Sequence, residues 1–143
     1  MFVIDGENCV LGRIAAQAAK AALNGKTVNI VNAEKIIISG RPDTTIAEYR
    51  TRLNRKNLAN PLKSAKLSRR PDFFVKRAIR GMLPRKSQRG LEAYRRIKAH
   101  IGVPTEFAGK GRKIGDAGEM RAKKISIGDL CQALGWKSAL SSG

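Results

Sequence analysis

Hydrophobic positions change their spacing several times within the first 40 residues. Residues 2–5 form a short apolar run that ends in turn residues, which predicts a strand. From Leu11 onward apolar side chains recur at helical spacing, and Asn24-Gly25 supplies the left-handed stop typical of a helix end. Residues 28–31 and 35–39 again form apolar runs typical of strands. A strand, a helix and a strand in this order imply a right-handed crossover with a parallel pair, and therefore an α/β fold.

The next segment predicts a helix with one apolar face. Thr45 and Glu48 have the spacing of a capping box, which would place the start of this helix at Thr45. Ile46, Tyr49 and Leu53 then share one face of this helix.

Two basic helices are expected further along, beyond an irregular basic arm at 54–71 that contains two prolines. Asp72 is expected to cap the first helix, and Leu83-Pro84 to end it, because a residue before proline avoids the helical region. The second helix is expected at 88–96, and residues 97–103 are expected to return to the sheet. The side chains expected to face inward are Val75, Ala78, Ile79, Met82, Leu91 and Tyr94.

The C-terminal part is expected to begin with a Gly-rich link over 108–122. A strand–helix extension would follow over 123–143, with the strand at 124–127 and the helix at 129–134. At 143 residues the chain is long enough for one core, so we expect residues 1–143 to form a single α/β domain.

Positive charge is concentrated in the middle of the chain. Residues 50–113 carry 20 Lys or Arg against three acids, a net of +17 out of the total of +18. Such an excess destabilises a compact fold unless a polyanion screens it, so it predicts a nucleic-acid-binding surface on an ordinary core. Aromatic residues make up only 5 % of the chain, which favours phosphate and shape contacts over extensive base stacking.

The residues expected to contact the nucleic acid are the basic side chains of the predicted helices and irregular segments. They are Arg50, Arg52, Arg55, Lys56, Lys63, Lys66, Arg69, Arg70, Lys76, Arg77, Arg80, Arg85, Lys86, Arg89, Arg95, Arg96, Lys110, Arg112 and Lys113. No helix-turn-helix, zinc-finger or basic-zipper pattern is recognisable, and the exposed aromatics of an RNA-recognition sheet are missing. Basic residues spread over helices and an arm suit a folded RNA better than a linear duplex.

The sequence gives little indication of nucleotide binding, metal binding or catalysis. The phosphate-binding glycine motifs are absent, and the cysteines lie far apart without metal-ligand spacing. The only histidine, His100, lies in a basic stretch, and no carboxylate pair is evident. We therefore expect no enzyme, cofactor, metal or small-molecule substrate. No apolar run reaches the roughly 18 residues of a membrane span, so a cytoplasmic protein is expected.

Several short motifs occur in an order that resembles the large-subunit ribosomal protein L-thirteen family, a universal family. They are Leu11-Gly12-Arg13-Ile14-Ala15, Val31-Asn32-Ala33-Glu34-Lys35, Arg70-Pro71-Asp72 and Ile79-Arg80-Gly81-Met82-Leu83-Pro84, followed by Arg89-Gly90 and Ile97. The resemblance extends over about residues 2–107. Residues 123–130 resemble the C-terminal extension of its archaeal and eukaryotic branch.

This resemblance implies a three-layer α/β/α core with a mainly parallel four-stranded sheet. It also implies a structural place in the large ribosomal subunit, with large-subunit (23S-type) rRNA and neighbouring ribosomal proteins as partners and a role early in subunit assembly. Arg80 would contact RNA, while Gly81 and Pro84 would shape the turn after its helix. The alternative function is a free RNA-binding regulator of translation.

Overall fold

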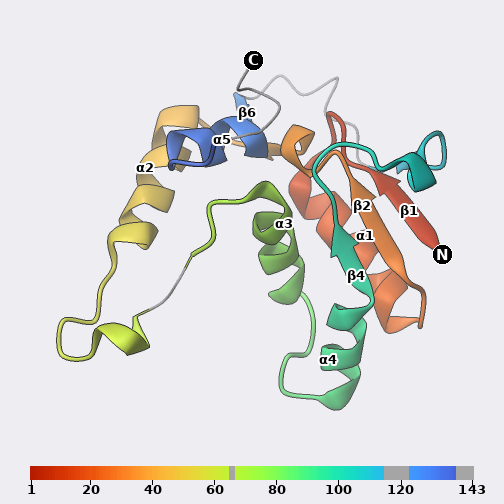
Figure 1. The fold of residues 1–143 in the computed structure, drawn as a ribbon, viewed down its shortest axis with the longest axis horizontal. Helices are drawn as coiled ribbons and strands as arrows, with labels where there is room; N and C mark the ends of the chain where they lie inside the picture. The colour runs from red at the N-terminus through yellow and green to blue at the C-terminus, as the bar shows by residue number, and fades with distance from the viewer. Residues whose placement is uncertain (65–66, 115–122, 138–143) are drawn as a thin grey trace.

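A parallel sheet lies in the right half of the molecule in the view of Figure 1. The computed structural model describes residues 1–64, 67–114 and 123–137. The strands of the sheet are β1 (Phe2–Asp5), β2 (Val28–Val31), β4 (Ile97–Ala99) and β5 (Arg112–Lys113). They lie in the order β4-β2-β1-β5, and every neighbouring pair is parallel. The expected α/β fold with a mainly parallel four-stranded sheet is confirmed.

The fourth strand was not foreseen, because Arg112 and Lys113 fall within the predicted Gly-rich link. They pair with Ile4 and Asp5 of β1. Gly111 permits this approach, since a Cβ atom there would lie 2.9 Å from the Cβ of Asp5, closer than real Cβ atoms come. Residues 115–122 of the link and 138–143 of the C-terminal extension lie outside the described residues.

The apolar run at 35–39 does not join this sheet. A 3₁₀ turn, η1 (Ala33–Lys35), precedes β3 (Ile37–Ser39). Strand β3 pairs antiparallel with β6 (Lys124–Ser126) to form a separate two-stranded sheet. Asn32, with a left-handed φ of 55°, turns the chain at the end of β2 before this segment. The expectation that 35–39 forms a buried strand holds for Ile37, whereas Ser39 is exposed.

Helix α1 (Leu11–Leu23) covers one face of the main sheet with alanine-rich packing (Figure 1). Its buried positions are Ile14, Ala15, Ala18, Ala19 and Ala22. The small side chains permit close packing, and two further helices, α3 (Pro71–Arg80) and α4 (Gln88–Arg95), pack against α1. On the opposite face of the sheet, Val3 and Val31 pack with Phe107, which closes the 3₁₀ turn η3 (Thr105–Phe107).

Helix α2 (Pro42–Asn54) begins three residues before the predicted capping box, so that prediction is wrong. Pro42 takes the first helical position, where its missing N–H costs nothing. The Thr45 hydroxyl donates to the Arg41 carbonyl within the first turn instead of capping it. The helix has no fully buried residue, but Tyr49 and Leu53 pack partly against the core.

Helix α3 (Pro71–Arg80) also begins with proline, so Asp72 lies inside the first turn and is not the cap. Its burial pattern differs from the prediction at the C-terminal end. Met82 is 48 % exposed, whereas Leu83 is only 6 % exposed. The helix ends at Arg80, and the turn that follows carries Leu83 back toward the core in place of Met82.

Helix α4 (Gln88–Arg95) has nearly its predicted bounds, but Leu91 is 47 % exposed and not inward. Ala93 takes the buried position of this short helix. Helix α5 (Ile127–Ala133) follows β6 and packs near α2, and Gly135 with a φ of 113° closes it as expected. Between α2 and α3, the described residues form one 3₁₀ turn, η2 (Pro61–Lys63), and otherwise irregular backbone.

Candidate RNA interface

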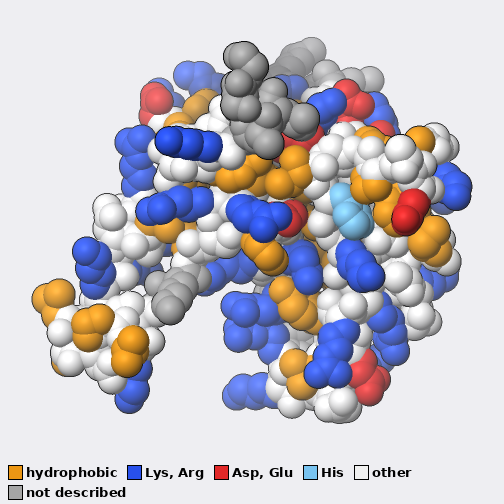
Figure 2. Space-filling model, viewed as in Figure 1, with side chains coloured by type: hydrophobic (Ala, Val, Ile, Leu, Met, Phe, Trp, Pro, Cys, Tyr) orange, Lys and Arg blue, Asp and Glu red, His pale blue; other side chains and the backbone are white. Residues whose placement is uncertain are grey.

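Basic side chains gather along α2, the segment after it, α3 and α4. In the space-filling view they line both sides of a concavity between the α2 side of the molecule and the α3–α4 side (Figure 2). These elements are consecutive in the chain, and each carries exposed cations.

Most of the predicted contact residues are exposed. Three of them are half-buried: Lys76, Arg80 and Arg96. Lys66 lies outside the described residues. The exposed residues are Arg50, Arg52, Arg55, Lys56, Lys63, Arg69, Arg70, Arg77, Arg85, Lys86, Arg89, Arg95, Lys110, Arg112 and Lys113.

Ion pairs within the protein neutralise little of this charge. In the described part of residues 50–113, Arg52 pairs with Glu48 at 2.6 Å and Arg70 with Asp72 at 3.0 Å. A third, long contact of 4.0 Å joins Arg96 to Glu92. Three acids in the whole stretch cannot balance 20 bases, so the surface keeps a strongly positive potential.

A first hollow lies between α2 and α3 and is lined by Arg52, Arg55, Leu67 and Arg77, with a volume of about 290 Å³. Arginine side chains from two helices therefore point into one space. A pair of aromatic rings lies beside one of these arginines. The Arg52 guanidinium lies 4.9 Å from the Tyr49 ring centre, and that ring lies 5.0 Å from Phe74. Burial raises the pKa of Tyr49, although the positive charge of Arg52 opposes the change.

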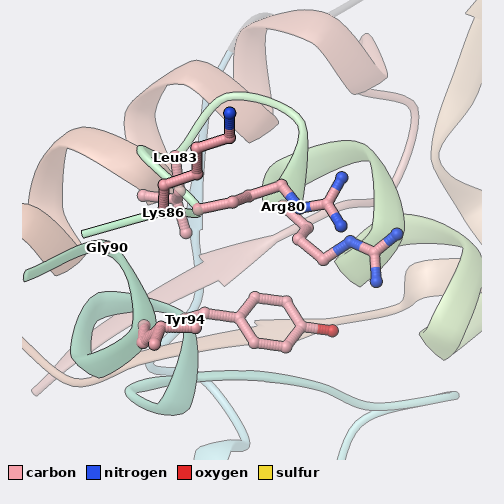
Figure 3. Close-up of a pocket in the computed structure, with 7 residues that line it drawn as sticks. Arg80, Leu83, Lys86, Gly90 and Tyr94 are labelled. Atoms are coloured by element: carbon pink, nitrogen blue, oxygen red, sulfur yellow. The ribbon is translucent and has the colours of Figure 1, made fainter. Parts of the chain in front are cut away.

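A second, larger hollow of about 580 Å³ lies between α3, the turn after it and α4 (Figure 3). Three cations and four apolar or small residues line it: Arg80, Arg85, Lys86, Leu83, Gly90, Leu91 and Tyr94. The prediction from sequence had placed Leu83 at a helix end and Leu91 in the core. Neither assignment anticipated a hollow between them.

The turn that shapes this second hollow depends on Gly90. A Cβ atom at that position would lie 2.0 Å from the Pro84 carbonyl oxygen. Ser87 connects the turn to the start of α4 by hydrogen bonds. Its backbone N–H and its hydroxyl both donate to the Pro84 carbonyl, and its hydroxyl oxygen accepts from the Gly90 N–H. Gly81, by contrast, ends α3 with an ordinary helical φ of −65° and has room for a Cβ. The pattern of hydrophobic residues along the chain does not predict this role of Gly90.

Some predicted contact residues make internal contacts or lie elsewhere. Arg96 donates to the Ala22 carbonyl at 3.0 Å, and Arg50 to the Ala133 carbonyl at 3.2 Å, so both join elements of the fold. Arg112 and Lys113 lie on β5, at the sheet edge opposite β4. They line a separate shallow hollow beside Phe2.

The side chains of Cys9 and Cys131 are buried. Burial, together with the nearby carboxylate of Asp72, raises the pKa of Cys131 to about 12. A thiol with so high a pKa stays protonated and is a poor nucleophile. Within the described ranges, no three His, Cys, Asp or Glu side chains lie close enough to hold a metal ion. No helix of those ranges has the length and apolar character of a membrane span.

A protein-family model described as "Ribosomal protein L13" matches residues 1–106. The chain belongs to the ribosomal protein L13 family. Relatives of this family extend the match into the C-terminal region. "Large ribosomal subunit protein uL13" of Methanococcus maripaludis is 43 % identical over 138 residues, which cover 96 % of this chain and 99 % of that protein. The protein of the same name from Methanosarcina barkeri is 43 % identical over 144 residues, covering 96 % of this chain and 99 % of its own. That of Aeropyrum pernix is 38 % identical over 145 residues, covering 97 % and 92 %. The resemblance found in the sequence motifs is thereby confirmed.

Proposed function

We propose that this chain is a structural constituent of the large ribosomal subunit in the cytoplasm. Its basic surface binds large-subunit rRNA, and its neighbours are other large-subunit proteins. The names of its archaeal relatives, "Large ribosomal subunit protein uL13", support this role. The protein acts early in subunit assembly, when folded RNA segments first need their converging phosphates neutralised.

The observation that carries the proposal is the convergence of cations from successive helices. Arg52 and Arg55 of the α2 side meet Arg77 of α3 in one hollow, and Arg80 meets Arg85 in the next. Arginine suits this task because its planar guanidinium binds phosphate oxygens in a bidentate manner. Phosphates from separate RNA strands that approach one another would each find a cation on these helices.

The test compares two double variants of equal charge change. Arg77→Ala/Arg80→Ala removes one cation from each hollow, while Lys20→Ala/Lys26→Ala removes two from the end of α1 and the loop after it, which line a different depression. Tagged proteins are sedimented from cell lysate with and without ribonuclease. We expect the control variant to co-migrate with the large subunit and the arginine variant to shift toward light fractions.

The salt dependence of binding to purified large-subunit rRNA gives an independent readout. Each lost phosphate contact reduces the slope of log K against log salt by about 0.7–0.9, so the arginine variant should lose up to about 1.8. Equal incorporation and equal slopes for both variants would refute the assignment of this surface. Recovery of the unmodified chain mainly in light fractions, bound to one short RNA, would favour a regulator of translation.

A further inference from the structure

The apolar wall of the hollow between α3 and α4 contains one residue, Leu91, that the fold leaves exposed. Leu91 is 47 % exposed although it lies on a helix whose core contact is made by Ala93. Leu91 lines the hollow together with Leu83 and Tyr94. The volume of the hollow, about 580 Å³, falls in the range of roughly 300–1,000 Å³ that small-ligand sites occupy. An exposed leucine beside an aromatic ring in such a space indicates a flat, partly apolar occupant.

The aromatic ring of this wall is held in place. The Lys76 ammonium lies 4.7 Å from the centre of the Tyr94 ring, a cation–π contact that fixes its orientation from α3. Tyr94 itself is half-buried, so it loses little further freedom when a ligand stacks on it. A ring that is ordered before binding stacks at low entropic cost.

Cations occupy the other side of the same hollow. Figure 3 shows the side chains of Arg80 and Lys86 on the side of the hollow opposite Tyr94, with the Lys86 ammonium directed away from the ring. Arg85, beside Lys86 in the turn, adds a third positive charge. Among the described residues that line the hollow, none is acidic. The occupant therefore combines a flat apolar surface with negative charge.

We propose that this hollow receives one unpaired nucleotide of the bound RNA. Its base stacks against Tyr94 and Leu91, and its phosphates contact Arg85 and Lys86. Proteins recognise RNA largely through bases that are splayed out of a helix and stacked on aromatic rings. The inference deepens the proposed function and rests on it, since the nucleotide belongs to the rRNA that the basic surface binds.

The experiment measures the affinity of the full-length chain for protein-free large-subunit rRNA at several salt concentrations. Tyr94→Leu removes the ring but keeps an apolar side chain, and Tyr94→Phe restores the ring. We expect Tyr94→Leu to weaken binding about ten-fold. Its salt slope should stay unchanged, because no phosphate contact is lost. Tyr94→Phe should bind within two-fold of the unmodified chain.

Two further variants keep the test decisive if Tyr94→Leu fails to fold, which a thermal melt would reveal. Leu91→Gln changes a half-exposed side chain on a helix and should weaken binding several-fold with an unchanged slope. Arg85→Ala/Lys86→Ala should instead reduce the slope by up to about 1.8. This contrast separates a stacked base from general charge attraction, which would respond only to the loss of cations.

The outcomes distinguish this inference from the proposed function. If the unmodified chain fails to bind the rRNA, the proposed function itself is wrong. If it binds with a steep salt slope while folded Tyr94→Leu or Leu91→Gln binds within two-fold of it, only the nucleotide site is wrong. Unchanged RNA affinity combined with poor retention in assembled subunits would assign the hollow to a protein neighbour and also overturn the nucleotide site.

Discussion

Replacement of Gly90 by alanine should destabilise the protein through one steric contact. The added Cβ would lie 2.0 Å from the Pro84 carbonyl oxygen and 2.6 Å from the carbonyl carbon, and both atoms belong to the backbone. Because no flexible side chain can move aside, either α4 or the turn before it must shift by more than 1 Å. Such overpacking costs about 3 kcal/mol. The better helix propensity of alanine returns less than about 1 kcal/mol near a helix start.

The net loss of about 2 kcal/mol corresponds to a fall in melting temperature of about 8 °C for a domain of this size. Circular dichroism of the isolated full-length chain measures it. Gly12→Ala is the matched control, since Gly12 also lies in the first turn of a helix but has no atom within 4 Å of its added Cβ. That variant should be unchanged or more stable by up to about 1 kcal/mol. Equal melting temperatures for the two variants would refute the steric argument.

Three other results are expected. Leu83→Ala should cost about 2–4 kcal/mol because Leu83 is 6 % exposed, whereas Met82→Ala should cost under about 1 kcal/mol; urea denaturation distinguishes them. Burial raises the folded-state pKa of Cys131 to about 12 and also raises that of Tyr49. The contribution of these protonated groups to the free energy of unfolding is therefore fully present below about pH 9 and is lost as the pH rises toward 12. Thermal melts at about pH 8 and pH 10.5 would show this decline, and Cys131→Ala would reduce it. Raising sodium chloride from about 0.1 M to 0.5 M should raise the melting temperature of the RNA-free chain by screening its cations, and a fall would contradict this expectation.

The first two strands and the helix between them could be predicted with correct bounds because their signals are local. A change of hydrophobic period marks each element, and Gly25, with a φ of 92°, ends the helix where the sequence places a turn. Strand β5 has no such signal. Both of its side chains are exposed and charged, and the strand exists only because Gly111 lets its backbone approach Asp5, which lies far earlier in the chain.

Errors in the predicted helices came from single positions where the tertiary context decides. A proline at the first helical position moved two helix starts away from Thr45 and Asp72, whose side chains resemble caps. Helical periodicity assigned Met82 and Leu91 to the core, but α3 ends before Met82 and Ala93 suffices to pack α4. The charge of the candidate interface was predictable from composition, whereas its two hollows were not, because they form between elements.

The rare aromatic residues explain how so basic a surface can be ordered before RNA binds. Three of the seven aromatic side chains in the chain hold a cation over their rings: Tyr49 with Arg52, Phe73 with Arg70 and Tyr94 with Lys76. Each such contact contributes only about 0.5–1 kcal/mol at an exposed site. Its larger effect is on entropy, since a long basic side chain that is already ordered loses less freedom when a phosphate binds. The aromatic residues of this surface therefore act chiefly as supports for cations, and Tyr94 alone among these three rings also lines the larger hollow.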